Sequence, residues 1–304
     1  MWAALLFGRL LTADGGLTVV GGLTAGVRVI VHWSRDTTAF GETDTLQVDA
    51  AGRFAALIRP TPDDSIRIVA EPSGESAYYG AAVVVHRERT GDEIRILLVP
   101  RRWTIRRGRF SGATVAIDPG AALRRSPDRA SFARLTRHRT VGWAPDSYPI
   151  PVVFRRADGE HIDAADSTDF WAAVGAVDDA IGMPLFRPAS DTARTGRIFP
   201  VDVGVGRIGS AAVTYVSWDR DGNIFEGSVT FRTVHELRER SIVEHELMHV
   251  LGFGHTAAWP SAVEARSPAN RTITVDDVAY AQLLLRAHAL EADPLLVGGL
   301  ADAR

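Results

Sequence analysis

The stretch Glu244-His-Glu-Leu-Met-His-Val-Leu-Gly-Phe-Gly-His255 decides the fold and the chemistry of the C-terminal half of this chain. Residues four apart lie on the same face of an α-helix, so the first two histidines can direct their imidazoles at one ion. Glycine adopts left-handed backbone at little cost, so the helix can end there and return a third histidine to the ion. The pattern is H-E-x-x-H-x-x-G-x-x-H, filled by His245, Glu246, His249, Gly252 and His255.

The flanking residues predict how this helix begins and where it packs. Thr233-Val-His-Glu236 fits a capping box, so we expect one helix over Val234–Leu251, with both histidines in its last two turns. The apolar residues that should hold the helix in a core are Ile242, Leu247, Val250 and Leu251. A second capping pattern, Thr274-Val-Asp-Asp277, predicts the start of a last helix.

The ligand set predicts a catalytic zinc site. Three neutral imidazoles, from His245, His249 and His255, leave a fourth position around Zn²⁺ open for water, whereas structural zinc sites fill all four positions with protein. In such a site the pKa of the water is about 7. Glu246 follows the first ligand and is expected to be the general base.

Residues 245–255 resemble the zinc-binding consensus of the metzincin metalloproteases, and the region from about 145 to 290 is similar to their matrixin branch. The resemblance covers a strand, a long helix, three strands, the active-site helix and a C-terminal helix. It implies an α+β, zincin-like catalytic domain with Zn²⁺ as cofactor. It also implies endopeptidase activity on a protein or peptide substrate that binds in extended form along an edge strand.

The elements that carry this resemblance can be placed on the chain. Phe170, Val174, Val177 and Ile181 fall on one helical face, and Gly182 follows as a stop. The expected strands are Ile150–Arg155, Arg197–Val205, Ala211–Trp218 and Ile224–Arg232. Asp219-Arg-Asp-Gly-Asn223 is expected to be a hairpin turn; a Ca²⁺ loop is the alternative, but the motif lacks the full ligand series.

One residue departs from the metzincin pattern. Metzincins have a methionine in a turn beneath the zinc, and Val263 lies where that methionine is expected. The departure leaves open a non-enzymatic, zinc-containing binding or adhesion protein with a decayed protease domain. A further alternative is a different HExxH hydrolase whose third ligand is an acid such as Glu264.

Residues 1–99 have the pattern of an all-β sandwich, so the chain is expected to be multidomain. Turn glycines around short strands resemble the prealbumin-like carboxypeptidase regulatory domains, and a carbohydrate or protein ligand is a possible partner. An Arg-rich linker is expected over 100–143, with a solvated basic face, and the protease domain over 144–304. The expected strands are Leu17–Val20, Val27–His32, Thr45–Val48, Phe54–Ile58, Ser65–Ala70, Ala81–Val85 and Glu93–Val99.

Composition excludes several classes of function. With 304 residues, 46% apolar and 23% charged, the chain is an ordinary globular protein. Its net charge of −3 argues against nucleic-acid binding. Cysteine and lysine are absent, which excludes disulfides, thiolate zinc sites, Schiff bases and the P-loop lysine.

Localisation is inferred from the expected activity. No apolar run reaches the ~18–20 residues that a membrane span needs. The apolar start, residues 1–7, lacks the basic residues and cleavage site of a good secretory signal. Because a free endopeptidase inside a cell would be hazardous, an extracellular, secreted location is expected.

Overall fold

The protein is described from a computed structural model. The described residues are 4–12, 27–34, 42–46, 48, 53–58, 65–72, 81–86, 94–118, 141–156, 162–189, 199–204, 209–219, 222–257, 259–265 and 271–292. The chain divides into two compact units, and the main boundary lies between Arg102 and Trp103. Each unit is described by itself.

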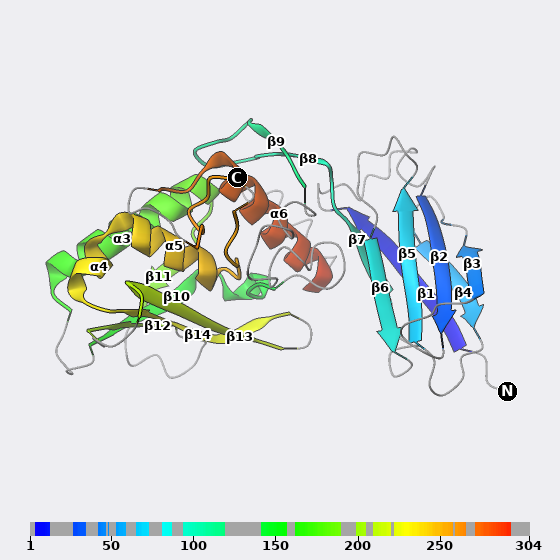
Figure 1. Ribbon diagram of the computed structural model, residues 1–304, viewed down its shortest axis with the longest axis horizontal. Coiled ribbons are helices and arrows are strands. Elements are labelled where there is room, and N and C mark those ends of the chain that lie inside the picture. Colours follow the sequence, from blue (N-terminus) through cyan, green and yellow to red (C-terminus); the bar gives the residue numbers. More distant parts are fainter. Residues whose placement is uncertain are drawn as a thin grey trace. The chain divides into compact units, whose positions relative to one another are not determined.

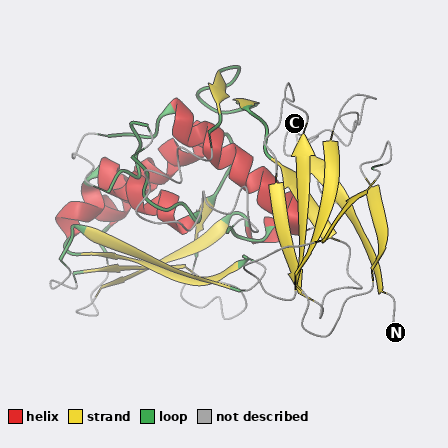
Figure 2. Cartoon of the chain, turned by 45° about the vertical axis from the view of Figure 1, so that its right-hand side comes forward, coloured by secondary structure: helices red, strands yellow, loops and turns green. Residues whose placement is uncertain are grey.

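The N-terminal unit contains two β-sheets (Figures 1 and 2). One has the order β4-β1-β7 and the other β3-β2-β5-β6. The strands are β1 Ala4–Thr12, β2 Val27–Ser34, β3 Glu42–Leu46, β4 Arg53–Ile58, β5 Ser65–Pro72, β6 Ala81–His86 and β7 Ile94–Leu98. Five expected strands are confirmed, the expected Thr45–Val48 overlaps β3 only at Thr45 and Leu46, β1 was not predicted, and Leu17–Val20 lies outside the described residues. The β-sandwich and its ligand stay predictions.

Part of the predicted Arg-rich linker packs on helix α6 (Val275–Ala292) of the second unit. It forms a hairpin of β8 (Arg102–Thr104) and β9 (Thr114–Ala116). The side chains that this segment buries are Trp103, Ile105, Val115 and Ile117, while the exposed ones include Arg101, Arg102, Arg106, Arg107 and Arg109. These arginines are therefore exposed to solvent, as expected for this basic segment. Gln282 of α6 accepts a hydrogen bond from the Arg106 N–H and donates one to the Arg107 carbonyl.

The second unit is built on a five-stranded sheet with the order β11-β10-β12-β14-β13. The first four strands in this order are parallel, and β13 is an antiparallel edge strand paired with β14. The bounds are β10 Ile150–Arg156, β11 Phe186–Pro188, β12 Phe199–Val203, β13 Ala212–Trp218 and β14 Ile224–Phe231. Four of these confirm the expected strands, and β11 was not predicted. The turn from Asp219 to Asn223 joins β13 and β14, with Gly222 at φ +87°.

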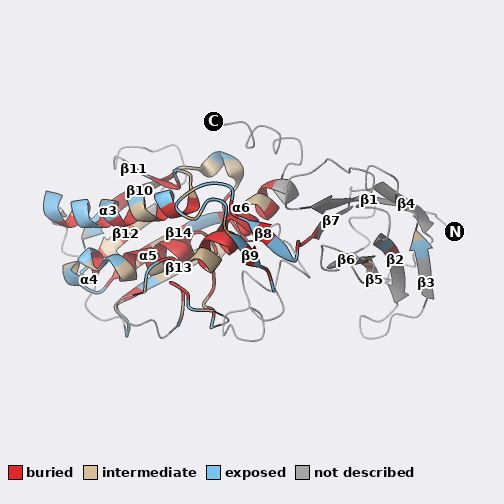
Figure 3. Ribbon diagram, turned by 90° about the horizontal axis from the view of Figure 1, so that it is seen from above, coloured by how far each residue is buried: buried red, intermediate tan, exposed pale blue. Residues whose placement is uncertain are grey.

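Helices cover one face of this sheet (Figure 1), and buried residues run along them (Figure 3). Helix α3 (Ala164–Ile181) starts at the N-cap Asp163 and ends at Gly182, where φ is +86°. The predicted stop at Gly182 is therefore confirmed. A short 3-10 helix, η2 (Pro145–Ser147), precedes β10.

The single helix expected over Val234–Leu251 is wrong, because the structure has two helices. These are α4 (Val234–Arg238) and α5 (Arg240–Val250), separated by extended backbone at Glu239. No glycine or proline marks the break. It coincides with a tertiary ion pair, in which Arg238 reaches the buried carboxylate of Asp166 in α3.

The first capping box, Thr233 to Glu236, is confirmed for the N-cap Thr233 but not for the reciprocal bond of Glu236 to the Thr233 backbone N–H. Thr233 caps α4 by accepting from the His235 N–H, and the Glu236 carboxylate bonds to the Thr233 hydroxyl and to Arg232. The second box is confirmed in full, since Thr274 and Asp277 each accept from the other's backbone N–H. Among the described residues, no helix is both long and apolar enough to cross a membrane.

Candidate metal centre and active site

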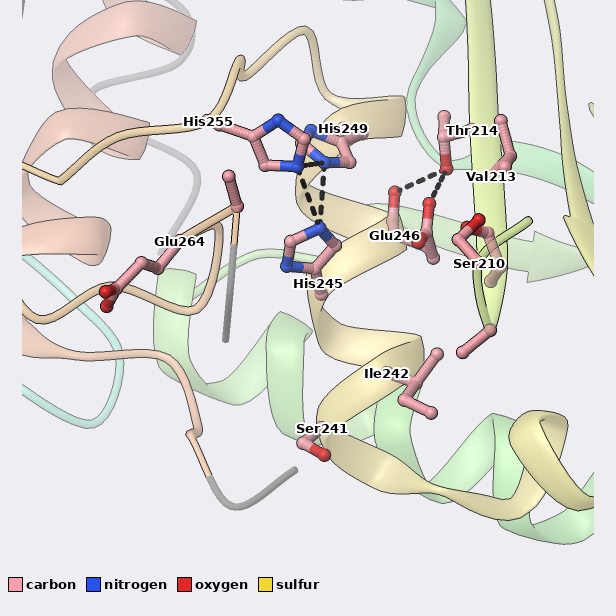
Figure 4. Close-up of a pocket in the computed structure, with 13 residues that line it drawn as sticks. Ser210, Val213, Thr214, Ser241, Ile242, His245, Glu246, His249, His255 and Glu264 are labelled. Carbon is pink, nitrogen blue, oxygen red and sulfur yellow. Dashed lines mark hydrogen bonds between the residues drawn. The ribbon is translucent and has the colours of Figure 1, made fainter. Parts of the chain in front are cut away.

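Three histidines converge in the second unit (Figure 4). The Nε2 atoms of His245 and His249 lie 3.0 Å apart. The Nε2 atom of His255 lies 3.2 Å from that of His249 and 3.3 Å from that of His245. Two of these rings come from the last turns of α5, and the third comes from the loop that follows. Gly252 makes the return possible. Its φ is +99°, and a Cβ there would lie 2.7 Å from the Val141 carbonyl oxygen.

Backbone carbonyls orient two of the rings. The Nδ1 of His245 lies 2.7 Å from the Ala262 carbonyl oxygen, and the Nδ1 of His249 lies 2.6 Å from that of Phe253. Because a carbonyl oxygen only accepts, each Nδ1 carries the proton, and each neutral ring turns an Nε2 lone pair toward the centre. Burial also lowers the pKa of His245, which favours the neutral, metal-binding form.

This donor set fits a zinc ion. Two Nε2 lone pairs 3.0 Å apart cannot hydrogen-bond to each other, but a cation between them satisfies both. In a tetrahedral site with zinc–nitrogen bonds of ~2.0–2.1 Å, the nitrogens lie about 3.3–3.4 Å apart. The three separations approach this spacing. Within the described part of the chain, the cluster consists of these histidines alone.

The acid considered as an alternative ligand has another partner. Glu264 lines the same pocket, but its carboxylate forms an ion pair with Arg271. It is not a member of the ligand cluster, and His255 takes the third position. The geometry therefore favours three histidines over two histidines and an acid.

Glu246 is buried beside the histidines, with 5% of its surface exposed. Its Oε2 accepts a hydrogen bond of 2.6 Å from the Thr214 hydroxyl. Burial raises the pKa of Glu246 to about 7, while the hydrogen bonds from Thr214 act in the opposite direction. A divalent ion on the adjacent ligands would lower this pKa again, because positive charge favours the carboxylate.

The loop beneath the histidines is held by one buried carboxylate. Asp277, 2% exposed, accepts hydrogen bonds from the Trp259 indole, the Ser261 hydroxyl and the Ala262 N–H. The same Ala262 offers its carbonyl to a ligand ring, so the loop determines how that ring points. Val263, at the expected methionine position, is fully buried here.

A pocket of about 440 Å³ opens over these groups. One wall is the edge strand β13, and another is α5 with Ser241 and Ile242. Ile242 was expected in the core, but it is half-buried because it faces this pocket. The predicted core positions Leu247, Val250 and Leu251 are buried.

The register of β13 shows which backbone groups face the open edge. The Arg232 N–H donates to the Ala211 carbonyl, which makes these two residues a hydrogen-bonded pair of the antiparallel ladder. Pairs alternate along such a ladder. The residues that direct their N–H and C=O groups away from β14 are therefore Ala212, Thr214 and Val216.

All four predicted site residues, His245, Glu246, His249 and His255, line this pocket. Sequence reasoning missed Thr214 and the two orienting carbonyls, and it identified Asp277 only as part of a helix cap. The cap pattern was a signal for Asp277 as a fixed acid. Thr214 carried no local signal, since its partner is 32 residues away.

No protein-family model matches this chain, and no curated protein sequence matches it. Function is therefore argued from the geometry of these residues.

Proposed function

We propose that this chain is a zinc-dependent endopeptidase. The single observation that carries the proposal is the convergence of three Nε2 atoms within 3.3 Å, with two of the rings locked by Nδ1 hydrogen bonds to carbonyls. His245, His249 and His255 would hold the ion. When bound, a zinc ion supplies Lewis acidity at the substrate carbonyl and makes water acidic enough to attack near neutral pH.

The remaining chemistry belongs to the protein. Glu246 lies in the same pocket, where its carboxylate takes a proton from water and returns it to the leaving amine. Its burial excludes bulk water and strengthens the electrostatic interactions around it. Peptide hydrolysis needs one group able to act as base and then acid, and this carboxyl meets that need.

The edge strand supports a peptide as the substrate. The outward backbone groups of β13 can pair with an extended segment, which is the mode of recognition called β-augmentation. An order of strand, long helix, strands, active-site helix and C-terminal helix supports the resemblance to metzincins, with β11 as an addition. The non-enzymatic alternative was based on Val263, whose apolar side chain is buried as that of a methionine there would be.

Metal analysis combined with a cleavage assay tests the proposal. The purified protein should contain one zinc per chain and cleave an unfolded protein, and a chelator should abolish cleavage. Glu246→Gln should keep the metal and lose at least ~10²-fold in rate. Stoichiometric zinc without cleavage of any peptide in a broad library would favour the binding-protein alternative. His255→Ala should reduce zinc content; unchanged content would contradict the ligand set.

A further inference from the structure

Thr214 is the residue through which the edge strand touches the general base. It lies in the middle of β13, and its side chain points toward α5 (Figure 4). Its Oγ1 lies 2.6 Å from Oε2 of Glu246 and 3.2 Å from that residue's backbone carbonyl. We propose that Thr214 is a positioning residue, whose hydroxyl holds the Glu246 carboxylate in its working orientation. This inference rests on the proposed function.

The alternation of the strand explains why this side chain reaches the helix. Val213 and Tyr215 are exposed, at 45% and 65%, on the face of the sheet away from α5. Thr214 lies on the opposite face, as does its register partner Val229, which is buried. The position of the hydroxyl is therefore fixed by the sheet and does not depend on a mobile loop.

The length of the bond indicates where the hydroxyl proton lies. Hydrogen bonds from a hydroxyl to a carboxylate are typically 2.5–2.7 Å long, and they are about twice as strong as neutral ones. A hydroxyl has one proton, so Thr214 donates to the nearer acceptor, Oε2. With that oxygen fixed, the other oxygen of Glu246 has a defined direction for proton exchange.

The same strand carries the backbone groups that face the substrate side. The N–H and C=O of Thr214 point away from β14, and both its hydroxyl and its N–H interact with the Glu246 carboxylate. The strand β13 would therefore position both the Glu246 carboxylate and a peptide that pairs with its open edge. Misplacing a catalytic group by ~1 Å can cost 10²-fold in rate, so this shared support should matter for turnover.

Two variants of Thr214 test the role. Thr214→Val removes the hydroxyl and keeps the shape; it should lower kcat roughly tenfold at unchanged KM and zinc content, because mispositioning acts on the chemical step. Thr214→Ser should recover most of the rate.

A matched control is Thr230→Val on β14. Thr230 pairs with Val213 and lies on the face of the sheet away from Thr214, so kcat should not change. Unchanged kcat in Thr214→Val, or no recovery in Thr214→Ser, would overturn the proposal. If Thr214→Val does not fold, Thr214→Ala removes the same hydroxyl.

A second measurement does not need activity. In metal-free protein, the unfolding midpoints of Thr214→Val, Glu246→Ala and the double variant form a cycle. Non-additive shifts are expected if the two side chains touch, and additive shifts would refute the contact. If the wild-type protein cleaves nothing, the proposed function fails, yet this cycle still decides whether Thr214 holds Glu246.

Discussion

Replacing Asp277 with asparagine should weaken both the fold and the zinc site. Oδ1 of Asp277 accepts from Trp259 and Ser261, and Oδ2 accepts from Ala262 and from Thr274. An amide keeps one oxygen, so at least two donors lose their acceptor and face an NH₂ group. At ~1.5–3 kcal/mol for each hydrogen bond to a charged group, we expect Asp277→Asn to lose about 3–6 kcal/mol of unfolding free energy.

The zinc affinity should fall in the same variant, for a separate reason. The Ala262 N–H bonds to Asp277, and the Ala262 carbonyl orients the ring of His245, so loosening this loop frees a ligand. Loss of such a supporting contact typically costs 10–100-fold in metal affinity. Urea unfolding of metal-free protein gives the first effect, and competition with a chelator gives the zinc Kd.

Asp276→Asn is the matched control. Asp276 is the preceding residue, is only half-buried, and has a pKa raised by burial and by its neighbour Asp277. Removing its charge should therefore leave zinc affinity unchanged and should not destabilise the fold. If Asp277→Asn binds zinc as tightly as the wild type, the loop does not control the ligand.

Three further changes have expected outcomes. Gly252→Ala places a Cβ against the Val141 carbonyl at positive φ, so both the unfolding midpoint and the zinc content should fall, as measured by thermal melts and elemental analysis. Burial raises the pKa of Asp178 to about 6, so its charged form disfavours the fold. Stability should then fall as pH rises from about 4 through about 6, and urea titrations should show a smaller fall in Asp178→Asn. Val263→Met overfills a buried position, so urea unfolding should show a loss of ~1–3 kcal/mol with zinc retained.

The convergence of the three histidines was predictable because their geometry is local. Helical periodicity alone aligns His245 with His249, and Gly252 then returns His255. Short apolar stretches between turn residues likewise placed most strands of both units to within a few residues, but not β1, β8, β9 or β11. Where the physics depends on neighbours in the chain, the sequence pattern was sufficient.

The missed features depend on contacts between distant residues. Thr214 matters because α5 lies beside β13, and the break at Glu239 accompanies an ion pair between Arg238 and Asp166. The strand β1 gains its identity from pairing with β4 and β7, and its own residues show only an apolar start. None of these partners can be recognised from local spacing.

The hydrogen bonds of Gln282 determine where a truncated variant of the C-terminal unit can begin. Its side-chain amide ties α6 to the Arg106–Arg107 backbone and to the carbonyl of Ile181. A truncation designed to isolate the C-terminal unit should therefore begin at or before Trp103. A truncation that begins at residue 144 would remove Trp103 and Ile105 and expose the apolar surface that they cover. It would also remove two hydrogen-bond partners of the Gln282 side-chain amide. The arginine-bearing hairpin is therefore an integral part of the surface of the C-terminal unit.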